Sequence, residues 1–250
     1  MELIRLETTD RVAVMTLCNE KALNAISVAM LREMDEALDN LGDAAVLVIT
    51  GAGEKAFAAG ADIAGMKDFT QEQAKEYSLF GNRVFRRIET LPIPVIAAVN
   101  GYALGGGLEL AMSADFRVMA DSAAVGQPEA SLGMTPGFGG TQRLPRLVGR
   151  AAAKYLLFTG DTIKADRAYQ LGLADVVVPK AELMDAVAAL AKKIAGMPAA
   201  ALAGAKRAVN EGVELGMDDG IELEANMYAA CFHTDDPKSL MTAFLERRKK

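Results

Sequence analysis

The sequence predicts an α/β fold that ends in a helical region. Two observations predict this class. Short apolar runs of strand length alternate with segments of helical periodicity along the first two thirds of the chain, and from about Ala151 onward helical segments prevail. The chain has 250 residues, of which 51% are hydrophobic, so it can bury a sizeable core in one large domain or two small ones.

Apolar runs identify the strands. Residues 11–17 alternate apolar and polar side chains, as a strand with one buried face does. Residues 45–50 and 94–100 are short and almost wholly apolar, which is typical of strands buried on both faces. Residues 116–120 repeat that pattern less clearly, and residues 175–178 form a last short apolar run. We therefore expect these five segments to be strands.

Spacing and capping residues identify the helices. Ser27 is a good N-cap, and Leu31, Met34, Leu38 and Leu41 follow it at helical intervals. The other segments with helical character are residues 71–89, 151–158, 164–171, 182–195, 199–212, 221–232 and 237–248. The last of these helices are rich in alanine and methionine. A thin helical tail cannot easily bury its own apolar faces, so we expect some of them to pack against another subunit.

The most informative segment is the run of three glycines at residues 105–107, which leads into Glu109. Glycines bare the backbone, so another molecule can approach its N–H groups. Residues 108–112 look like the start of a helix, where free N–H groups attract negative charge. Apolar neighbours predict that Glu109 is partly buried, which raises a carboxyl pKa. The alternative is that Glu109 only complements the helix dipole.

Two further elements suit a ligand site less specifically. Residues 57–63 combine small side chains with Asp62, and alone they could be a tight turn in which Asp62 caps a helix. In residues 126–133, Pro128 restricts the backbone around Gln127 and holds Glu129 in a defined place after a strand. Alone, Glu129 could equally be an acidic residue in an exposed turn.

Composition disfavours several other functions. The net charge of −6 argues against nucleic-acid binding, which depends on basic surface. Cys18, Cys231 and the single histidine, His233, form no metal-binding motif, and two distant thiols suit a reducing cytoplasm. The first residues lack the apolar core of a signal peptide. The uncharged stretch 90–108 contains two prolines and four glycines, so we do not expect it to cross a membrane.

Taken together, the motifs resemble the enoyl-CoA hydratase/isomerase superfamily, or crotonase family, over essentially the whole chain. The segments that carry the resemblance are Ala-Leu-Asn-Ala at 22–25, residues 58–63, residues 94–101, the triple glycine, Gly-Gln-Pro-Glu at 126–129, and residues 136–144, 165–173 and 241–249. The sequence is most similar to the short-chain bacterial crotonases, which interconvert crotonyl-CoA and 3-hydroxybutyryl-CoA. In combination these motifs are highly specific.

The resemblance implies a fold and a site. The fold would be a spiral of ββα units at residues 1–195, followed at residues 196–250 by a helical region used in trimerisation, and members are usually dimers of trimers. The backbone N–H groups of Ala61 and Gly106 would form an oxyanion hole, and Glu109 and Glu129 would be the catalytic acids and bases. Further candidates for contacts with the substrate and its CoA moiety are Lys21, Ala22, Ala59, Gly60, Asp62, Ile63 and Lys67.

The implied activity is hydration of a short-chain 2-enoyl-CoA, or the reverse loss of water. CoA would arrive with the thioester substrate, and no metal or redox cofactor would be needed. A double-bond isomerase of the same fold is the nearest alternative, although many isomerases keep a glutamate only at the position matching Glu129. An RNA-binding protein and a non-catalytic CoA-ester binder are the alternatives from other classes. The sequence leaves open the acyl chain length, the physiological direction and the oligomer number.

Overall fold

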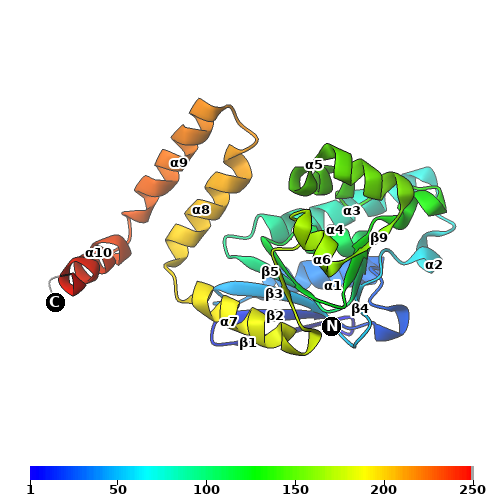
Figure 1. Cartoon of the computed structure of the whole chain (residues 1–250), viewed down its shortest axis with the longest axis horizontal. Helices are drawn as coiled ribbons and strands as arrows, with labels where there is room; N and C mark the ends of the chain where they lie inside the picture. Colours follow the sequence, from blue (N-terminus) through cyan, green and yellow to red (C-terminus); the bar gives the residue numbers. More distant parts are fainter. Residues whose placement is uncertain (249–250) are drawn as a thin grey trace.

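The computed structural model describes residues 1–248 and contains two sheets surrounded by helices (Figure 1). Residues 249–250, at the end of the predicted helical region 196–250 and of the motif 241–249, lie outside the described part. The larger sheet has the strand order β1-β2-β3-β5-β7-β10. Its strands are β1 (Ile4–Thr9), β2 (Val12–Leu17), β3 (Val46–Gly51), β5 (Val95–Val99), β7 (Phe116–Ala120) and β10 (Val176–Val178). All neighbours pair in parallel except β1 and β2.

The smaller sheet has the order β4-β6-β8-β9, and β4, β6 and β8 run parallel. Its strands are β4 (Ala56–Ala58), β6 (Tyr102–Leu104), β8 (Ala124–Gly126) and β9 (Thr162–Lys164). Three successive units of chain each place one strand in the larger sheet, the next strand in the smaller sheet, and then a helix. The pairs are β3 with β4, β5 with β6, and β7 with β8. The spiral of ββα units that the resemblance implied is therefore confirmed.

The helices up to residue 195 lie around the sheets, and those after it lead away from them (Figure 1). In chain order they are α1 (Val28–Asp39), α2 (Ile63–Met66), α3 (Gln71–Glu89), α4 (Gly106–Met112), α5 (Gly140–Thr159), α6 (Ala165–Gln170), α7 (Leu183–Ala195), α8 (Ala199–Gly212), α9 (Met217–Cys231) and α10 (Asp236–Arg247). Ser27 caps α1 as predicted, since its side chain accepts a hydrogen bond from the Met30 N–H at 3.1 Å. The α/β class and the helical end of the chain are both confirmed.

The predicted elements differ from the structure in three ways. First, β1 was not predicted, because it is an edge strand with mostly exposed polar side chains. Second, hydrophobic periodicity did not identify the strands of the smaller sheet, because each has three residues, too few to show a period. Third, α5 begins at Gly140 rather than at residue 151, because Pro145 and the non-helical Gly149 (φ 77°, ψ 159°) interrupt the periodic pattern.

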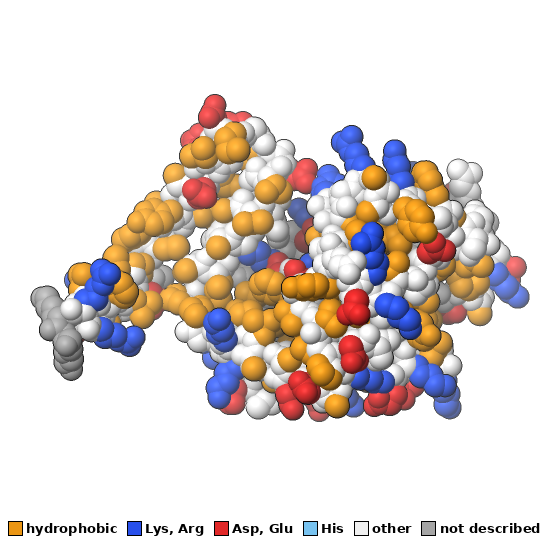
Figure 2. Space-filling model, in the orientation of Figure 1, with side chains coloured by type: hydrophobic (Ala, Val, Ile, Leu, Met, Phe, Trp, Pro, Cys, Tyr) orange, Lys and Arg blue, Asp and Glu red, His pale blue; other side chains and the backbone are white. Residues whose placement is uncertain are grey.

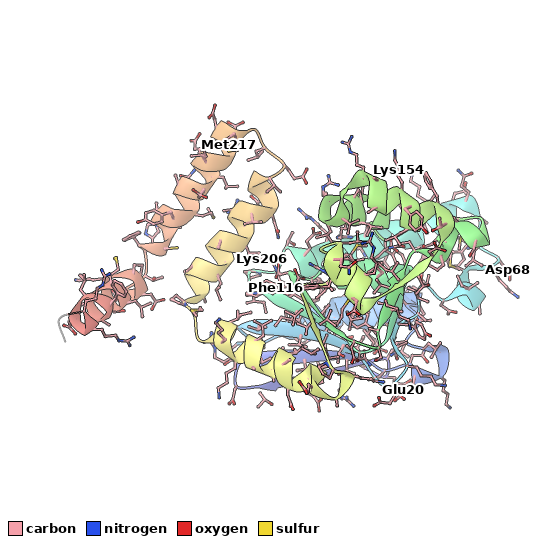
Figure 3. All side chains as sticks on the ribbon, in the orientation of Figure 1. Glu20, Asp68, Phe116, Lys154, Lys206 and Met217 are labelled. Carbon is pink, nitrogen blue, oxygen red and sulfur yellow. The ribbon has the colours of Figure 1, made fainter. Side chains whose placement is uncertain are left out.

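The helices α8, α9 and α10 project away from the rest of the chain (Figure 1). They contain no buried residue, and apolar side chains gather along them (Figure 2). Met217 is 78% exposed and Val213 is 73% exposed. Lys206 ties α8 to the sheets, since its Nζ lies 2.8 Å from an Asp115 carboxylate oxygen and donates to the Ile93 carbonyl at 3.0 Å (Figure 3). These three helices are therefore held to the rest of the chain by polar contacts and carry a large uncovered apolar surface.

No single helix among residues 1–248 combines the length and the apolar character needed to cross a bilayer. Only the pair formed by residues 180–195 and 199–212, which is bent by 105°, meets that length and composition when taken together.

The buried Arg117 side chain should contribute strongly to the stability of the fold. Its guanidinium is buried and donates to the carbonyls of Leu173 (2.8 Å) and Ala114 (3.0 Å) and to Asp175 Oδ2 (2.8 Å), which ties β7 to the chain before β10. Arg117→Ala removes the donors to both carbonyls and the cation beside Asp175, which keeps only the hydrogen bond from the residue 117 backbone N–H, and we expect a loss of about 3 kcal/mol in unfolding free energy. Urea denaturation measures it.

The matched control is Arg207→Ala, which breaks an exposed ion pair with Glu211 one turn along α8. We expect that variant to change the unfolding free energy by less than about 0.5 kcal/mol. Equal losses of unfolding free energy in the two variants would show that the contribution of Arg117 to stability does not depend on the burial of its hydrogen bonds.

Candidate active site

Three loops that follow parallel strands of the smaller sheet bring the candidate groups together. Ala61 follows β4, Gly106 follows β6, and Glu129 follows β8. Because β4, β6 and β8 are neighbours that run in the same direction, their carboxyl ends meet at one edge of the sheet. Glu109 reaches the same place from the first turn of α4. The successive units thus each deliver one part of the site.

Glycine is required where β6 passes into α4. Gly105 adopts φ +49° and ψ −123°, a conformation that side-chain-bearing residues rarely adopt. A Cβ on Gly107 would lie 1.9 Å from the carbonyl oxygen of Ala58, so the first turn of α4 is packed directly against β4. This close approach brings the start of α4 beside the loop after β4, where Ala61 lies.

Two backbone N–H groups meet between these loops. Ile26 bonds to Gly60 and Asp62 in a parallel bridge, so the Ala61 N–H between them points away from that neighbour. A Cβ on Gly106 would lie 3.5 Å from Ala61 N, which shows how close the two residues are. Within residues 1–248, neither the Ala61 N–H nor the Gly106 N–H donates to a protein acceptor. Both donors are therefore available to a bound oxygen atom.

Glu109 is buried and firmly held. It is 1% exposed, and its Oε1 accepts hydrogen bonds from the N–H groups of Phe138 (2.8 Å) and Gly140 (2.6 Å). The pKa of Glu109 is raised to about 7, mainly by burial and in smaller part by the nearby charge of Glu129. The two backbone N–H groups and Arg143 act in the opposite direction. The predicted burial of Glu109 and the upward shift of its pKa are both confirmed.

Glu129 lies in the 3₁₀ helix η2 (Pro128–Leu132) and is half-buried. Burial raises the pKa of its carboxyl. Gln127 is fully buried beside it, and with its amide nitrogen toward Glu129 it donates to Oε2 at 3.0 Å and to Oε1 at 2.9 Å. A Cβ on Gly105 would lie 2.8 Å from Glu129 Oε1, so a glycine there also leaves room for this carboxyl.

Ala61, Gly106 and the two glutamates line one cavity of about 420 Å³. Its apolar walls include Met66, Tyr77, Met134 and Phe138. The sequence-predicted residues that line it are Ala59, Gly60, Ala61, Ile63, Gly106, Glu109 and Glu129. A larger groove of about 1470 Å³ lies over β1, β2 and α7 and contains neither Glu109 nor Glu129. The smaller cavity is therefore the one with the polar groups that chemistry requires.

Four predicted contact residues lie outside the cavity lining: Lys21, Ala22, Asp62 and Lys67. The first two lie in the short 3₁₀ helix η1 (Glu20–Ala22), and the residue after it contacts the loop that follows β4, since the Ala59 N–H donates to the Leu23 carbonyl at 2.9 Å. Asp62 does cap a helix, because its Oδ1 accepts from the Gly65 N–H of α2 at 3.3 Å.

Sequence reasoning did not find three residues that hold the carboxyls, namely Gln127, Phe138 and Gly140. Gln127 was noted only for the restriction that Pro128 places on its backbone. Phe138 and Gly140 act through backbone N–H groups, which no side-chain pattern reveals. The dense glycines of residues 137–140 were the available signal, because such a run often exposes backbone donors. Among residues 1–248, no three His, Cys, Asp or Glu side chains gather as a metal site would require.

Two sheets built from ββα units, with free backbone donors and two carboxyls at the ends of three parallel strands, match the arrangement that the sequence resemblance implied. Comparison with known proteins agrees. The enoyl-CoA hydratase/isomerase family matches residues 7–250. A short-chain-enoyl-CoA hydratase of Clostridium acetobutylicum is 47% identical, over 98% of this chain and 95% of that protein. A crotonyl-CoA hydratase of Syntrophomonas wolfei is 48% identical, over 99% of this chain and 96% of that protein.

Comparison with solved structures agrees with the sequence comparison. The crystal structure of an enoyl-CoA hydratase from Bacillus anthracis superposes with a TM-score of 0.94 and is 38% identical, over 98% of this chain and 96% of that chain. The chain belongs to the enoyl-CoA hydratase/isomerase family.

The raised pKa of Glu109 predicts how stability changes with pH. Its ordinary pKa of 4.5 rises to about 7 in the folded protein, so between these values the folded state binds more protons than the unfolded state. Stability therefore falls as pH rises through this window, by about 3 kcal/mol in total. Glu109→Gln removes the titration, so the variant should gain stability relative to the wild type as pH rises. Urea denaturation of both proteins between about pH 5 and 8 measures the difference, and parallel pH curves would contradict the prediction.

Proposed function

We propose that this protein is an enoyl-CoA hydratase that adds water to short-chain trans-2-enoyl-CoA esters such as crotonyl-CoA and also catalyses the reverse reaction. The observation that carries this proposal is the presence of two carboxyls and two free backbone N–H groups around one cavity. The similar proteins named above, a short-chain-enoyl-CoA hydratase and a crotonyl-CoA hydratase, support the choice of reaction and of a short acyl chain.

The two N–H groups would stabilise the charge that develops during the reaction. Attack of water at Cβ moves an electron pair onto the thioester oxygen and forms an enolate. Donors from Ala61 and Gly106 bind that oxygen more strongly as its charge grows, and only this difference accelerates the reaction. Each such donor contributes roughly 3 kcal/mol. Gly106 is also the first residue of α4, where the helix dipole favours negative charge.

The two glutamates would carry the protons. Glu109, which two backbone N–H groups stabilise in its ionised form, takes a proton from water while the water oxygen bonds to Cβ. Glu129, whose pKa is raised by burial, gives a proton to Cα as the enolate collapses. Each transfer contributes about 10²- to 10⁴-fold in rate. Dehydration reverses both roles, and the adjacent carboxyls titrate as a pair.

The thioester brings CoA with it, so the proposed reaction uses no metal or redox cofactor. We assign Ala59, Gly60 and Ile63, together with Ala22 and Asp62 on the neighbouring loops, to the rim that receives the CoA moiety. Lys21 and Lys67 are exposed and are the candidates for its phosphates.

We further propose a homo-oligomer, a trimer or a dimer of trimers, in which residues 196–250 cover neighbouring subunits of the 1–195 core. The uncovered apolar surface of α8 to α10 supports this assignment. Cys18 and Cys231 are free thiols, which supports a cytoplasmic location.

A double-bond isomerase is the second candidate, because the fold is shared. An isomerase moves one proton between two carbons, so one carboxyl suffices. The presence of both Glu109 and Glu129 in the cavity favours the hydratase. Assays with 2-enoyl-CoA and 3-enoyl-CoA esters of the same length distinguish the two reactions. RNA binding is disfavoured by the net charge of −6, and a salt-sensitive mobility shift would revive it.

Substitution of each carboxyl tests the proton transfers. Glu109→Gln and Glu129→Gln each remove one proton carrier with little change of shape, and we expect kcat for crotonyl-CoA hydration to fall at least about 100-fold. Binding of a CoA ester should persist, because the substituted groups do not hold the thioester. Absorbance of the enoyl thioester measures the rate, and calorimetry measures the binding. Full activity in either variant would refute the role of that residue.

Gly106→Pro tests the oxyanion hole. Proline lacks the N–H, so one of the two donors to the thioester oxygen is lost, and we expect kcat/KM to fall at least about 100-fold. Circular dichroism checks that the variant is folded. Near-normal turnover by the folded variant would count against the assignment of this N–H.

A further inference from the structure

The loop that holds Glu109 is itself held by α3. The Gly137 carbonyl oxygen accepts two hydrogen bonds from this helix, one from Ser78 Oγ at 2.5 Å and one from Asn82 Nδ2 at 2.7 Å. The next N–H along the chain, that of Phe138, donates to Glu109 Oε1 at 2.8 Å. The Gly137 carbonyl and the Phe138 N–H are the two ends of one peptide unit. Side chains of α3 thus bind one end of this unit, and the carboxyl binds the other.

Both amide hydrogens of Asn82 are used in hydrogen bonds. Its amide nitrogen has two hydrogens, and it donates both to the Gly137 carbonyl and to the Ser78 carbonyl one turn earlier, at 2.9 Å. A Cβ on Gly139 would lie 3.0 Å from Asn82 Oδ1, so the loop is packed against this side chain. The other end of the loop is held independently by Arg143, which donates to the Phe138 carbonyl at 2.9 Å.

A carbonyl that accepts two donors polarises its peptide unit and strengthens the N–H at the other end. A stronger and better aimed N–H favours the ionised form of the carboxyl that accepts it. We propose that Ser78 and Asn82 are positioning residues that act on Glu109 through the Gly137–Phe138 peptide. This inference rests on the proposed function, in which Glu109 is the base.

The charged groups that also act on the Glu109 carboxyl are Glu129 from η2 and Arg143 from α5. The phenol of Tyr77 from α3 lies nearby and stays neutral, because its pKa is raised by burial. Substitution of Asn82 or Ser78 leaves all three in place and removes no charge. A change in the titration of Glu109 in such variants therefore reports the peptide contact and not a new charge in the site.

The test compares Asn82→Ala with the wild type across pH. Loss of the donor should raise the pKa of Glu109, so less of the base is ionised at a given pH. The acid limb of the kcat/KM profile for crotonyl-CoA should move to higher pH by about one unit. We expect kcat to fall about tenfold while KM changes less than about twofold.

Matched variants separate positioning from folding. Asn40→Ala removes the same kind of amide, which donates to the carbonyl four residues earlier on α1 (Glu36, 2.8 Å) and lies on the exposed surface. Its pH profile should match that of the wild type. Ser78→Ala should shift the acid limb in the same direction as Asn82→Ala and serves as the test if the latter does not fold. Ser78→Thr keeps the hydroxyl and should keep the profile.

A second measurement does not depend on activity. Infrared titration detects the protonated carboxyl of Glu109, identified as the band that Glu109→Gln lacks. In Asn82→Ala this band should persist to higher pH than in the wild type. An unchanged titration, or lower kcat without any shift of the acid limb, would overturn the positioning role. If the wild type fails to hydrate crotonyl-CoA, the proposed function fails, and the infrared result still decides the role of Asn82.

Discussion

The burial of the Glu109 carboxyl beneath the loop of residues 136–140 is the interaction on which the site depends. A carboxylate without water is costly unless hydrogen bonds replace its hydration. Here the N–H groups of Phe138 and Gly140 supply them, and the loop that carries these groups is bound in turn by side chains of α3 and α5. The same burial brings the pKa close to neutrality, where a carboxyl can both take and return a proton.

The packing around this carboxyl explains several sequence features together. Gly107 lets α4 approach β4, Gly105 turns the chain and leaves room for Glu129, and Pro128 begins the short helix that carries that second carboxyl. An aromatic cluster backs the loop, with the Phe138 ring at 5.0 Å from that of Tyr77 and 5.5 Å from that of Phe85. Core packing and the geometry of the candidate site therefore depend on the same residues, and a substitution in this cluster would affect both.

Much of the architecture could be predicted from local patterns. The buried strands β3 and β5 and the amphipathic α1 and α3 have periods long enough to recognise, and the apolar neighbours of Glu109 indicated its burial correctly. The three-residue strands of the smaller sheet and the polar edge strand β1 have no such period, because pairing with their neighbours, and not a pattern of their own, makes them strands. The donors to Glu109 could not be predicted either, since they are backbone groups brought there by the fold. The hydrogen bonds from the Gln127 amide to Glu129 could not be predicted from the sequence either. Only the turn at Pro128 brings these two side chains into contact.

The arrangement of repeated ββα units has a consequence for how such a scaffold diversifies. One unit carries the Ala61 amide, the next carries the Gly106 amide and Glu109, and the third carries Glu129, so the groups that we propose for the reaction come from separate segments of chain. Replacement of one of these segments changes the group that it carries. The groups on the other segments stay in place, because each is held by its own strand. Under the proposed roles, a descendant protein can therefore lose or replace one proton carrier and still keep the two backbone N–H groups that would polarise a thioester.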